Sequence, residues 1–213
     1  MWFGSARWSL SSKLTGRVGV FGGSFDPIHD AHLEVGRVAL EQFGLEKVLF
    51  VPNGLPADGT EAVGRRREHR YQMAVAAVAG RSGFVVSRIE IDRDGVSYTI
   101  DTIRALQQDY GQGICFIIGA DSLVRIDQWK EPEAIIASVP FAVAPRAGIS
   151  FAAFEQGLFE EASIWPLEMP EVDLSSTALR ERVGRGESIA ESVPAAVMAY
   201  IEEQGLYRDA ALA

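Results

Sequence analysis

The chain has 213 residues, of which 47% are apolar and 23% charged, and its formal net charge is −9 at pH 7. This length suits one sizeable α/β domain, and this composition is that of a folded protein rather than a disordered one. The negative charge argues against binding to nucleic acid or to an anionic membrane surface, although a local group of arginines can still hold a small anion.

The first residues of the chain and its single cysteine indicate in which cellular compartment we expect the protein. No apolar run approaches the roughly 20 residues of a membrane helix, and residues 1–16 lack the apolar centre of a signal peptide. We expect residues 1–16 to be a loose extension in front of one domain, residues 17–213. Cys115 lies in an apolar run, which predicts a small buried hydrophobe rather than a nucleophile and fits a reducing, cytoplasmic compartment.

The first half of the chain predicts strands and helices in alternation. Strands are expected at 18–21, 47–51 and 84–87, the last continuing over 89–91, and helices at 30–43, 65–79 and from 97–102 to about 111. We expect Asp30 to cap the first helix and Gly44 to end it. Residues 52–64, rich in Pro, Gly and Asp, predict a surface loop.

The second half continues the alternation. Strands are expected at 114–118, 141–144 and 162–165, and helices at 132–138, 151–159, 173–183 and 194–203, the last with Pro194 in its first turn. Strand, helix and strand within about 35 residues form a βαβ unit, which favours a parallel sheet. We therefore predict an α/β, Rossmann-like, doubly wound parallel sheet with helices on both faces, in a single domain.

Two glycines, a serine and two histidines lie where the first strand passes into the first helix: Gly22, Gly23, Ser24, His29 and His32. Glycines let a backbone approach a ligand, a helix start offers free N–H groups to an anion, and imidazoles can donate to phosphate oxygens. The alternative is a tight turn with surface histidines. Function is favoured because two of the three histidines of the chain are here, and a metal site is disfavoured because no third ligand is nearby.

A second group of residues opens a later helix: Ser175, Ser176, Thr177 and Arg180. Hydroxyls at a helix start can cap it and can also bind an anion, to which an arginine adds a fixed positive charge. A plain N-cap with a solvated arginine explains this segment equally well. A distant second phosphate-type segment in the same chain tips the balance toward function.

A third group follows the strand at 114–118. Asp121 comes after Gly119 at the carboxyl end of this strand, where parallel sheets bind ligands, and Trp129 lies eight residues further on. A carboxylate here can accept hydrogen bonds from ribose hydroxyls, and a tryptophan can stack on a flat ring. Ordinary core packing is an equally good explanation for Trp129 taken alone.

Two nucleotide-binding patterns are absent from the sequence. There is no Gly-x-x-x-x-Gly-Lys-Ser/Thr, which disfavours a P-loop kinase or ATPase. There is no Gly-x-Gly-x-x-Gly after the first strand, which disfavours a dinucleotide-type oxidoreductase.

The segment 22–32 resembles the signature of the nucleotidylyltransferase superfamily with paired histidines, and 175–180 resembles the second signature of that superfamily. The segments 97–102 and 119–123, Trp129 and the tail 194–207 narrow the resemblance to the bacterial nicotinate-mononucleotide adenylyltransferases. The resemblance covers about residues 17–207, with its motifs in the same order as in the family.

This resemblance implies an enzyme of NAD biosynthesis that joins nicotinate mononucleotide and ATP into deamido-NAD and pyrophosphate. The phosphate of the mononucleotide would attack the α-phosphorus of ATP in line, and because that phosphate is already ionised no general base is needed. Mg²⁺ would enter with ATP, held mainly by phosphate oxygens and water rather than by a protein metal site. The expected partners are ATP and nicotinate mononucleotide, with neither nucleic acid nor membrane.

The resemblance also implies roles for particular residues. The catalytic residues would be His29, His32 and Arg180. The ATP-binding residues would be Gly22, Gly23, Ser24, Phe25, Gly119, Asp121, Ser175, Ser176 and Thr177. The residues that bind nicotinate mononucleotide would be Thr99, Trp129 and Arg146.

The chain departs from the family pattern at two places. Ala31 stands where the family usually has glycine, a change that a helix accepts. The loop Leu55–Asp58 lacks the basic residue that the family usually carries there, and Arg65, Arg66 or Arg67 is a candidate replacement. This loop leaves open a different acceptor, such as nicotinamide mononucleotide or pantetheine phosphate, or a catalytically idle nucleotide-binding protein. The sequence does not distinguish a monomer from a homodimer or another oligomer.

Overall fold

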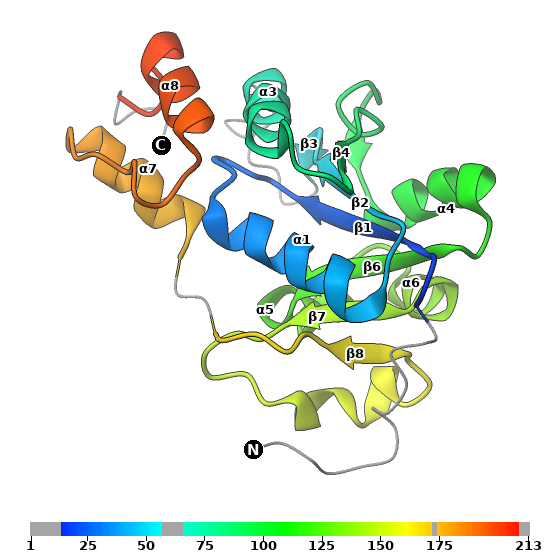
Figure 1. The fold of residues 1–213 in the computed structure, drawn as a ribbon. Helices are drawn as coiled ribbons and strands as arrows, with labels where there is room; N and C mark the ends of the chain where they lie inside the picture. Colours follow the sequence, from blue (N-terminus) through cyan, green and yellow to red (C-terminus); the bar gives the residue numbers. More distant parts are fainter. Residues whose placement is uncertain (1–13, 57–65, 172–173, 209–213) are drawn as a thin grey trace.

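A parallel β-sheet runs through the middle of the molecule, with helices on both of its faces (Figure 1). The computed structural model describes residues 14–56, 66–171 and 174–208. The strands of the sheet are β1 (Val18–Gly23), β2 (Lys47–Pro52), β4 (Phe84–Val86), β6 (Ile114–Gly119), β7 (Phe141–Ala144) and β8 (Ile164–Pro166). Their order across the sheet is β4-β2-β1-β6-β7-β8, and every neighbouring pair is parallel.

The helices divide between the two faces. One face carries α1 (Asp30–Phe43), α3 (Arg67–Val78), α7 (Ser176–Gly184) and α8 (Ala195–Gln204). The other carries α4 (Thr99–Tyr110), α5 (Ala120–Leu123), the short 3-10 helix η2 (Ile126–Gln128) and α6 (Pro132–Ser138). The predicted doubly wound α/β fold, with helices on both faces, is confirmed.

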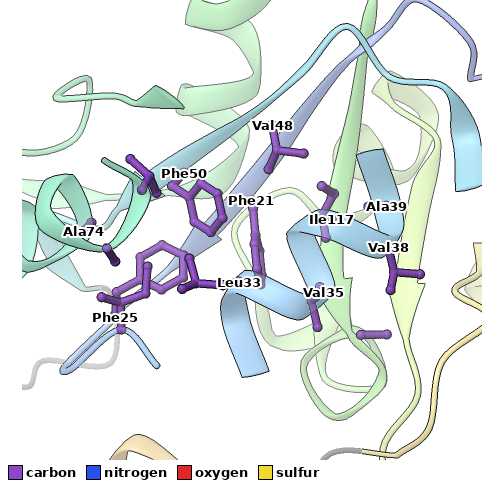
Figure 2. Close-up of a cluster of buried hydrophobic side chains, with 14 of the residues drawn as sticks. Phe21, Phe25, Leu33, Val35, Val38, Ala39, Val48, Phe50, Ala74 and Ile117 are labelled. Carbon is purple, nitrogen blue, oxygen red and sulfur yellow. The ribbon is translucent and has the colours of Figure 1, made fainter. Parts of the chain in front are cut away.

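The alternation of side chains along the strands supplies both halves of the core. In β1, Val18 and Val20 point to the face of α4, while Phe21 points to the face of α1. On the α1 face, Phe21, Phe25 and Phe50 pack their rings together beneath α1 and α3 (Figure 2). Phe25 belongs to the turn that leads from β1 into α1, so this cluster anchors the turn in the core.

Cys115 behaves as predicted. Its side chain is buried in β6, and burial raises the pKa of its thiol to about 12. A thiol with that pKa carries almost no nucleophilic thiolate at neutral pH.

Several predicted boundaries need correction. Residues 89–91 form a turn rather than a continuing strand, and 151–159 forms two short 3-10 helices, η3 (Phe151–Phe154) and η4 (Gly157–Phe159). His29 rather than Asp30 occupies the N-cap of α1, because the extended backbone that precedes the helix ends at His29. Pro194 likewise takes the cap position of α8 instead of its first turn.

The predicted loop 52–64 contains a two-residue strand. This strand, β3 (Leu55–Pro56), pairs in parallel with β5 (Val96–Ser97), just before α4. The remainder of that loop, with Ala57, Asp58 and Arg65, lies outside the described residues, as does Asp173.

The expected N-terminal extension falls mostly outside the described part of the chain. Of its last residues, Leu14 is buried in the core, and the N–H of Gly16 donates to the Gly44 carbonyl at 2.9 Å. Among the residues that the structure describes, none of the helices is both long enough and apolar enough to cross a membrane.

Candidate active site

A cavity of about 730 Å³ opens at the carboxyl ends of β1, β6 and β7. The strand order reverses between β1 and β6, which is where open parallel sheets bind their ligands. The predicted site residues that line this cavity are Gly22, Gly23, Ser24, Phe25, His29, His32, Thr99, Gly119, Asp121, Trp129 and Arg146. Residues from four separate predicted segments therefore surround one space.

The two histidines at the start of α1 stack on each other. Their ring centroids are 3.6 Å apart and their planes differ by 21°. The backbone N–H of His29 donates to Nδ1 of His32 at 3.3 Å. Because Nδ1 is the acceptor, a neutral His32 carries its proton on Nε2, where it is available to an anion in the cavity.

Both imidazoles are held in the neutral form. Burial, helped by the positive charge of Arg146, lowers the pKa of His29 from its ordinary 6.5 to about 4. Burial also lowers the pKa of His32 well below its ordinary value, and the neighbouring His29 and Arg146 add to that effect. At neutral pH the pair thus supplies hydrogen-bond donors rather than fixed charges.

Phe25 supports His32 from below. Its ring meets the His32 ring edge-on, with centroids 5.0 Å apart, and is almost fully buried. A Cβ at Gly23 would come within 3.1 Å of the Phe25 ring, so a side chain at this position would press on that ring. The predicted contacts of Phe25 and Gly23 with ATP remain predictions.

The second predicted group lies behind the turn that follows β1 and does not line the cavity. Ser175 caps α7, its Oγ accepting from the N–H of Ala178 at 3.2 Å. Ser176 donates its hydroxyl to the Pro27 carbonyl at 3.0 Å, and Nη1 of Arg180 donates to the Asp26 carbonyl at 2.9 Å.

The hydrogen-bond donors of the Arg180 guanidinium are not all used. Its Nη2 donates to the hydroxyl of Thr177 at 3.3 Å, while its Nε is buried without a hydrogen-bond partner within the described part of the chain. A buried donor without a partner is a position that an anion can satisfy.

The carboxylate predicted for ribose lies at the start of α5. Oδ1 of Asp121 is 3.4 Å from Nε of Arg146, and a Cβ at Gly119 would lie only 2.4 Å from the same oxygen. Gly119 therefore leaves room for the Asp121 side chain. Arg125, which the sequence did not single out, also lines the cavity and donates from Nε to the Asp121 carbonyl at 3.1 Å.

The cavity lining also includes the residues predicted to meet a flat ring. Trp129 and Thr99 both line the cavity, from the end of η2 and the start of α4. Lys130 joins these two elements, because its Nζ is 3.0 Å from Oδ2 of Asp101 and 4.6 Å from the centroid of the Tyr98 ring. The wall that carries Trp129 is therefore fixed relative to α4.

Glu90 is a cavity residue that sequence reasoning missed. Its carboxyl group is buried, accepts from the Thr102 hydroxyl at 2.6 Å, and has its pKa raised by burial. The alternating pattern Ile89-Glu90-Ile91 is typical of a strand. The sequence therefore predicted a strand here instead of a turn with a buried acidic residue.

Arg66 and Arg70, at the start of α3, bind the loops that follow β1 and β2. Arg70 is fully buried in α3 and donates to the carbonyls of Ser24 at 2.7 Å and Gly54 at 3.0 Å. Burial lowers the pKa of its guanidinium to about 10, so it stays charged at neutral pH. The signal available in the sequence was the position of Arg70 on the same helical face as the buried Met73 and Ala77.

Of the candidates for the missing loop cation, Arg66 is bound to Asp26, with Nη2 and Oδ2 2.7 Å apart, and Arg67 is exposed at the start of α3. The basic side chains in the described wall of the cavity are Arg125 and Arg146. No group of three or more His, Cys, Asp or Glu suited to a metal ion occurs within residues 14–56, 66–171 and 174–208.

The site and fold can be compared with known proteins. A model of the cytidylyltransferase-like family matches residues 20–182. A relative from Moorella thermoacetica, named probable nicotinate-nucleotide adenylyltransferase, is 39% identical over 200 residues, which cover 91% of this chain and 92% of the relative. A relative of the same name from Rubrobacter xylanophilus is 38% identical over 197 residues, covering 90% and 92%.

Solved structures share the fold. The nicotinic acid mononucleotide adenylyltransferase of Plasmodium falciparum complexed with NaAD superimposes with a TM-score of 0.72 at 17% identity, over 91% of this chain and 98% of that one. The same protein complexed with APC gives a TM-score of 0.69 at 18% identity, over 90% and 96%.

The lowered pKa of His29 predicts how the stability of the protein depends on pH. Between pH 6.5 and about 4 the unfolded chain binds a proton at His29 that the folded chain does not, so the free energy of unfolding should fall as the pH falls through this window. The full effect of His29 is about 3 kcal/mol. Urea unfolding of wild type and His29→Gln at half-unit pH steps should give a shallower slope for the variant.

The control for this experiment is His69→Gln, which removes the one histidine outside the site and against which the slope of His29→Gln is compared. An unchanged slope in His29→Gln would contradict the assignment of the buried, neutral imidazole.

Proposed function

The chain belongs to the cytidylyltransferase-like family, and within it to the nicotinate-nucleotide adenylyltransferases, and we propose on this basis that it joins nicotinate mononucleotide and ATP. The products are deamido-NAD and pyrophosphate, a step of NAD biosynthesis. The observation that carries the proposal is one cavity lined by the paired histidines, Asp121 and Trp129, in a chain 38–39% identical to relatives of that name.

The reaction needs no proton acceptor on the protein. An oxygen of the acceptor's phosphate attacks the α-phosphorus of ATP, the new P–O bond forms, and the bond to the β-phosphate oxygen breaks with its electron pair on pyrophosphate. The phosphate nucleophile is already ionised near neutral pH. The protein's task is therefore to align the two phosphates and to stabilise the negative charge of the transition state.

His29 and His32 suit this task. Their rings stand at the start of α1, where the positive end of the helix dipole also favours an anion. The Nε2–H of His32 is fixed as a donor by the hydrogen bond at its Nδ1. Donors already in place cost little reorganisation when charge builds on the transferred phosphoryl group.

A second grip on the triphosphate comes from the start of α7. Arg180 and Ser176 bind the turn that carries the two histidines but do not line the described cavity, so this contact requires the triphosphate to reach past that turn. The unpartnered Nε of Arg180 supports such a phosphate contact. Mg²⁺ bound to ATP would be held mainly by phosphate oxygens and water, and would neutralise part of the triphosphate charge.

The acceptor takes the side of the cavity formed by Trp129 and Thr99. Trp129 offers a face for the pyridine ring, and Arg146, with Arg125 beside it, supplies positive charge for the acceptor's phosphate. The single cysteine, buried in the core, fits the reducing cytoplasm in which we place the reaction.

The acceptor is tested directly by pyrophosphate release from MgATP. We expect the highest kcat/KM with nicotinate mononucleotide, and lower values with nicotinamide mononucleotide and with pantetheine phosphate. Release only with one of the other two acceptors would replace the proposed substrate. Release with none of them, under conditions where a homologous enzyme is active, would favour an idle nucleotide-binding protein.

The role of the histidine pair is tested by His32→Ala. Loss of a preorganised donor should lower kcat by about 100-fold, whereas KM for nicotinate mononucleotide should change little, because the acceptor wall belongs to other elements. His69→Ala, which changes a histidine of α3 outside the cavity, is the matched control. A kcat of His32→Ala near that of His69→Ala would contradict the assignment.

A further inference from the structure

The turn between β1 and α1 contains a buried carboxylate that the reaction does not use. Asp26 is 1% exposed and lies three residues before His29. An ionised carboxylate in such a place is costly unless it is paired and hydrogen-bonded. Its partners therefore reveal what holds the turn in its shape.

Two side chains from distant segments satisfy Asp26. The hydroxyl of Tyr207 donates to Oδ1 at 2.7 Å, and Nη2 of Arg66 donates to Oδ2 at 2.7 Å. The Arg66 guanidinium also lies over the Tyr207 ring, 5.6 Å from its centroid. The Asp26 carboxylate, the Arg66 guanidinium and the Tyr207 ring thus pack together next to the turn that carries His29 and His32, here called the histidine turn.

Tyr207 is held in an unfavourable backbone conformation for this contact. Its φ is +66°, a region that residues with a side chain rarely adopt, and its side chain is 4% exposed. Strain of this kind persists only where the surroundings fix it. Burial and the Asp26 carboxylate raise the pKa of Tyr207 well above its ordinary value, so its hydroxyl remains a donor.

Hydrogen bonds also hold the backbone at Asp26 and after it. Arg180 binds the Asp26 carbonyl, Ser176 binds the Pro27 carbonyl, and the N–H of Asp30 donates to the Ser192 carbonyl at 3.0 Å. The contacts of this turn thus come from α7, from the loop before α8 and from the residues after α8. Figure 1 places α7 and α8 beside the start of α1.

We propose that the Tyr207 hydroxyl and the Asp26 carboxylate form a lock through which the C-terminal segment positions His29 and His32. Both are positioning residues: neither lines the cavity, and each acts through the turn that carries the imidazoles. The effect on turnover rests on the proposed adenylyl transfer, while the effect on the imidazoles does not.

Helix α8, which precedes Tyr207, offers a matched control. The hydroxyl of Tyr200 is 3.0 Å from Nδ1 of His69, so it also ties α8 to α3. The described contacts of Tyr200 do not include the histidine turn. If the C-terminal segment merely added stability, Tyr200→Phe and Tyr207→Phe would affect the protein in the same way.

The experiment compares Tyr207→Phe with Tyr200→Phe in the full chain. For Tyr207→Phe we expect kcat to fall about 10-fold, with KM for nicotinate mononucleotide within about twofold of wild type. NMR titration of the imidazole protons should show the pKa of His29 rising toward its ordinary value, because a loosened turn admits water. Tyr200→Phe should leave both kcat and the pKa of His29 as in wild type.

Unchanged kcat and unchanged His29 pKa in Tyr207→Phe would overturn the lock, as would equal effects in the two variants. If wild type does not turn over nicotinate mononucleotide, the proposed function fails, and the NMR arm alone decides the lock. If Tyr207→Phe does not fold, Asp26→Asn, which keeps the shape of the side chain, is judged by the same two readings.

Discussion

The turn between β1 and α1 must leave the sheet, bury the Asp26 carboxylate and still present two imidazoles to a cavity. Its carbonyls have no strand partners, so arginines from elsewhere satisfy them: Arg70 binds the Ser24 carbonyl and Arg180 the Asp26 carbonyl. Because each donor comes from a helix packed on the same face as α1, the position of the histidines depends on that whole layer. The active-site geometry is thus a property of the tertiary fold rather than of the motif alone.

Electrostatics follow from this arrangement. The chain as a whole is acidic, yet Arg125 and Arg146 line the cavity at the carboxyl ends of the strands, where a phosphate compound would enter. The same packing shields the imidazoles of His29 and His32 from water, which keeps both of them neutral. Neutral donors suit a reaction that needs charge stabilisation without proton transfer, since they are in place before the phosphates arrive.

Local pattern was sufficient for most of the fold and for the cavity wall. Buried strands and glycine punctuation predicted the sheet, and the segments ending in His32, Asp121 and Trp129 meet at one cavity. The sequence did not predict hydrogen bonds between residues that are far apart in the chain. Tyr207 lies 181 residues from Asp26, and Arg70 lies 46 residues from Ser24. No periodicity encodes such pairs, because only the packed helices bring them together.

The most direct test of this account is the crystal structure of the protein with a non-hydrolysable ATP analogue, Mg²⁺ and nicotinate mononucleotide. We expect Nε2 of His32 at hydrogen-bond distance, about 2.7–3.2 Å, from a phosphate oxygen of the analogue, and the pyridine ring stacked on Trp129. A triphosphate bound away from the start of α1, with His32 in contact with neither ligand, would contradict it.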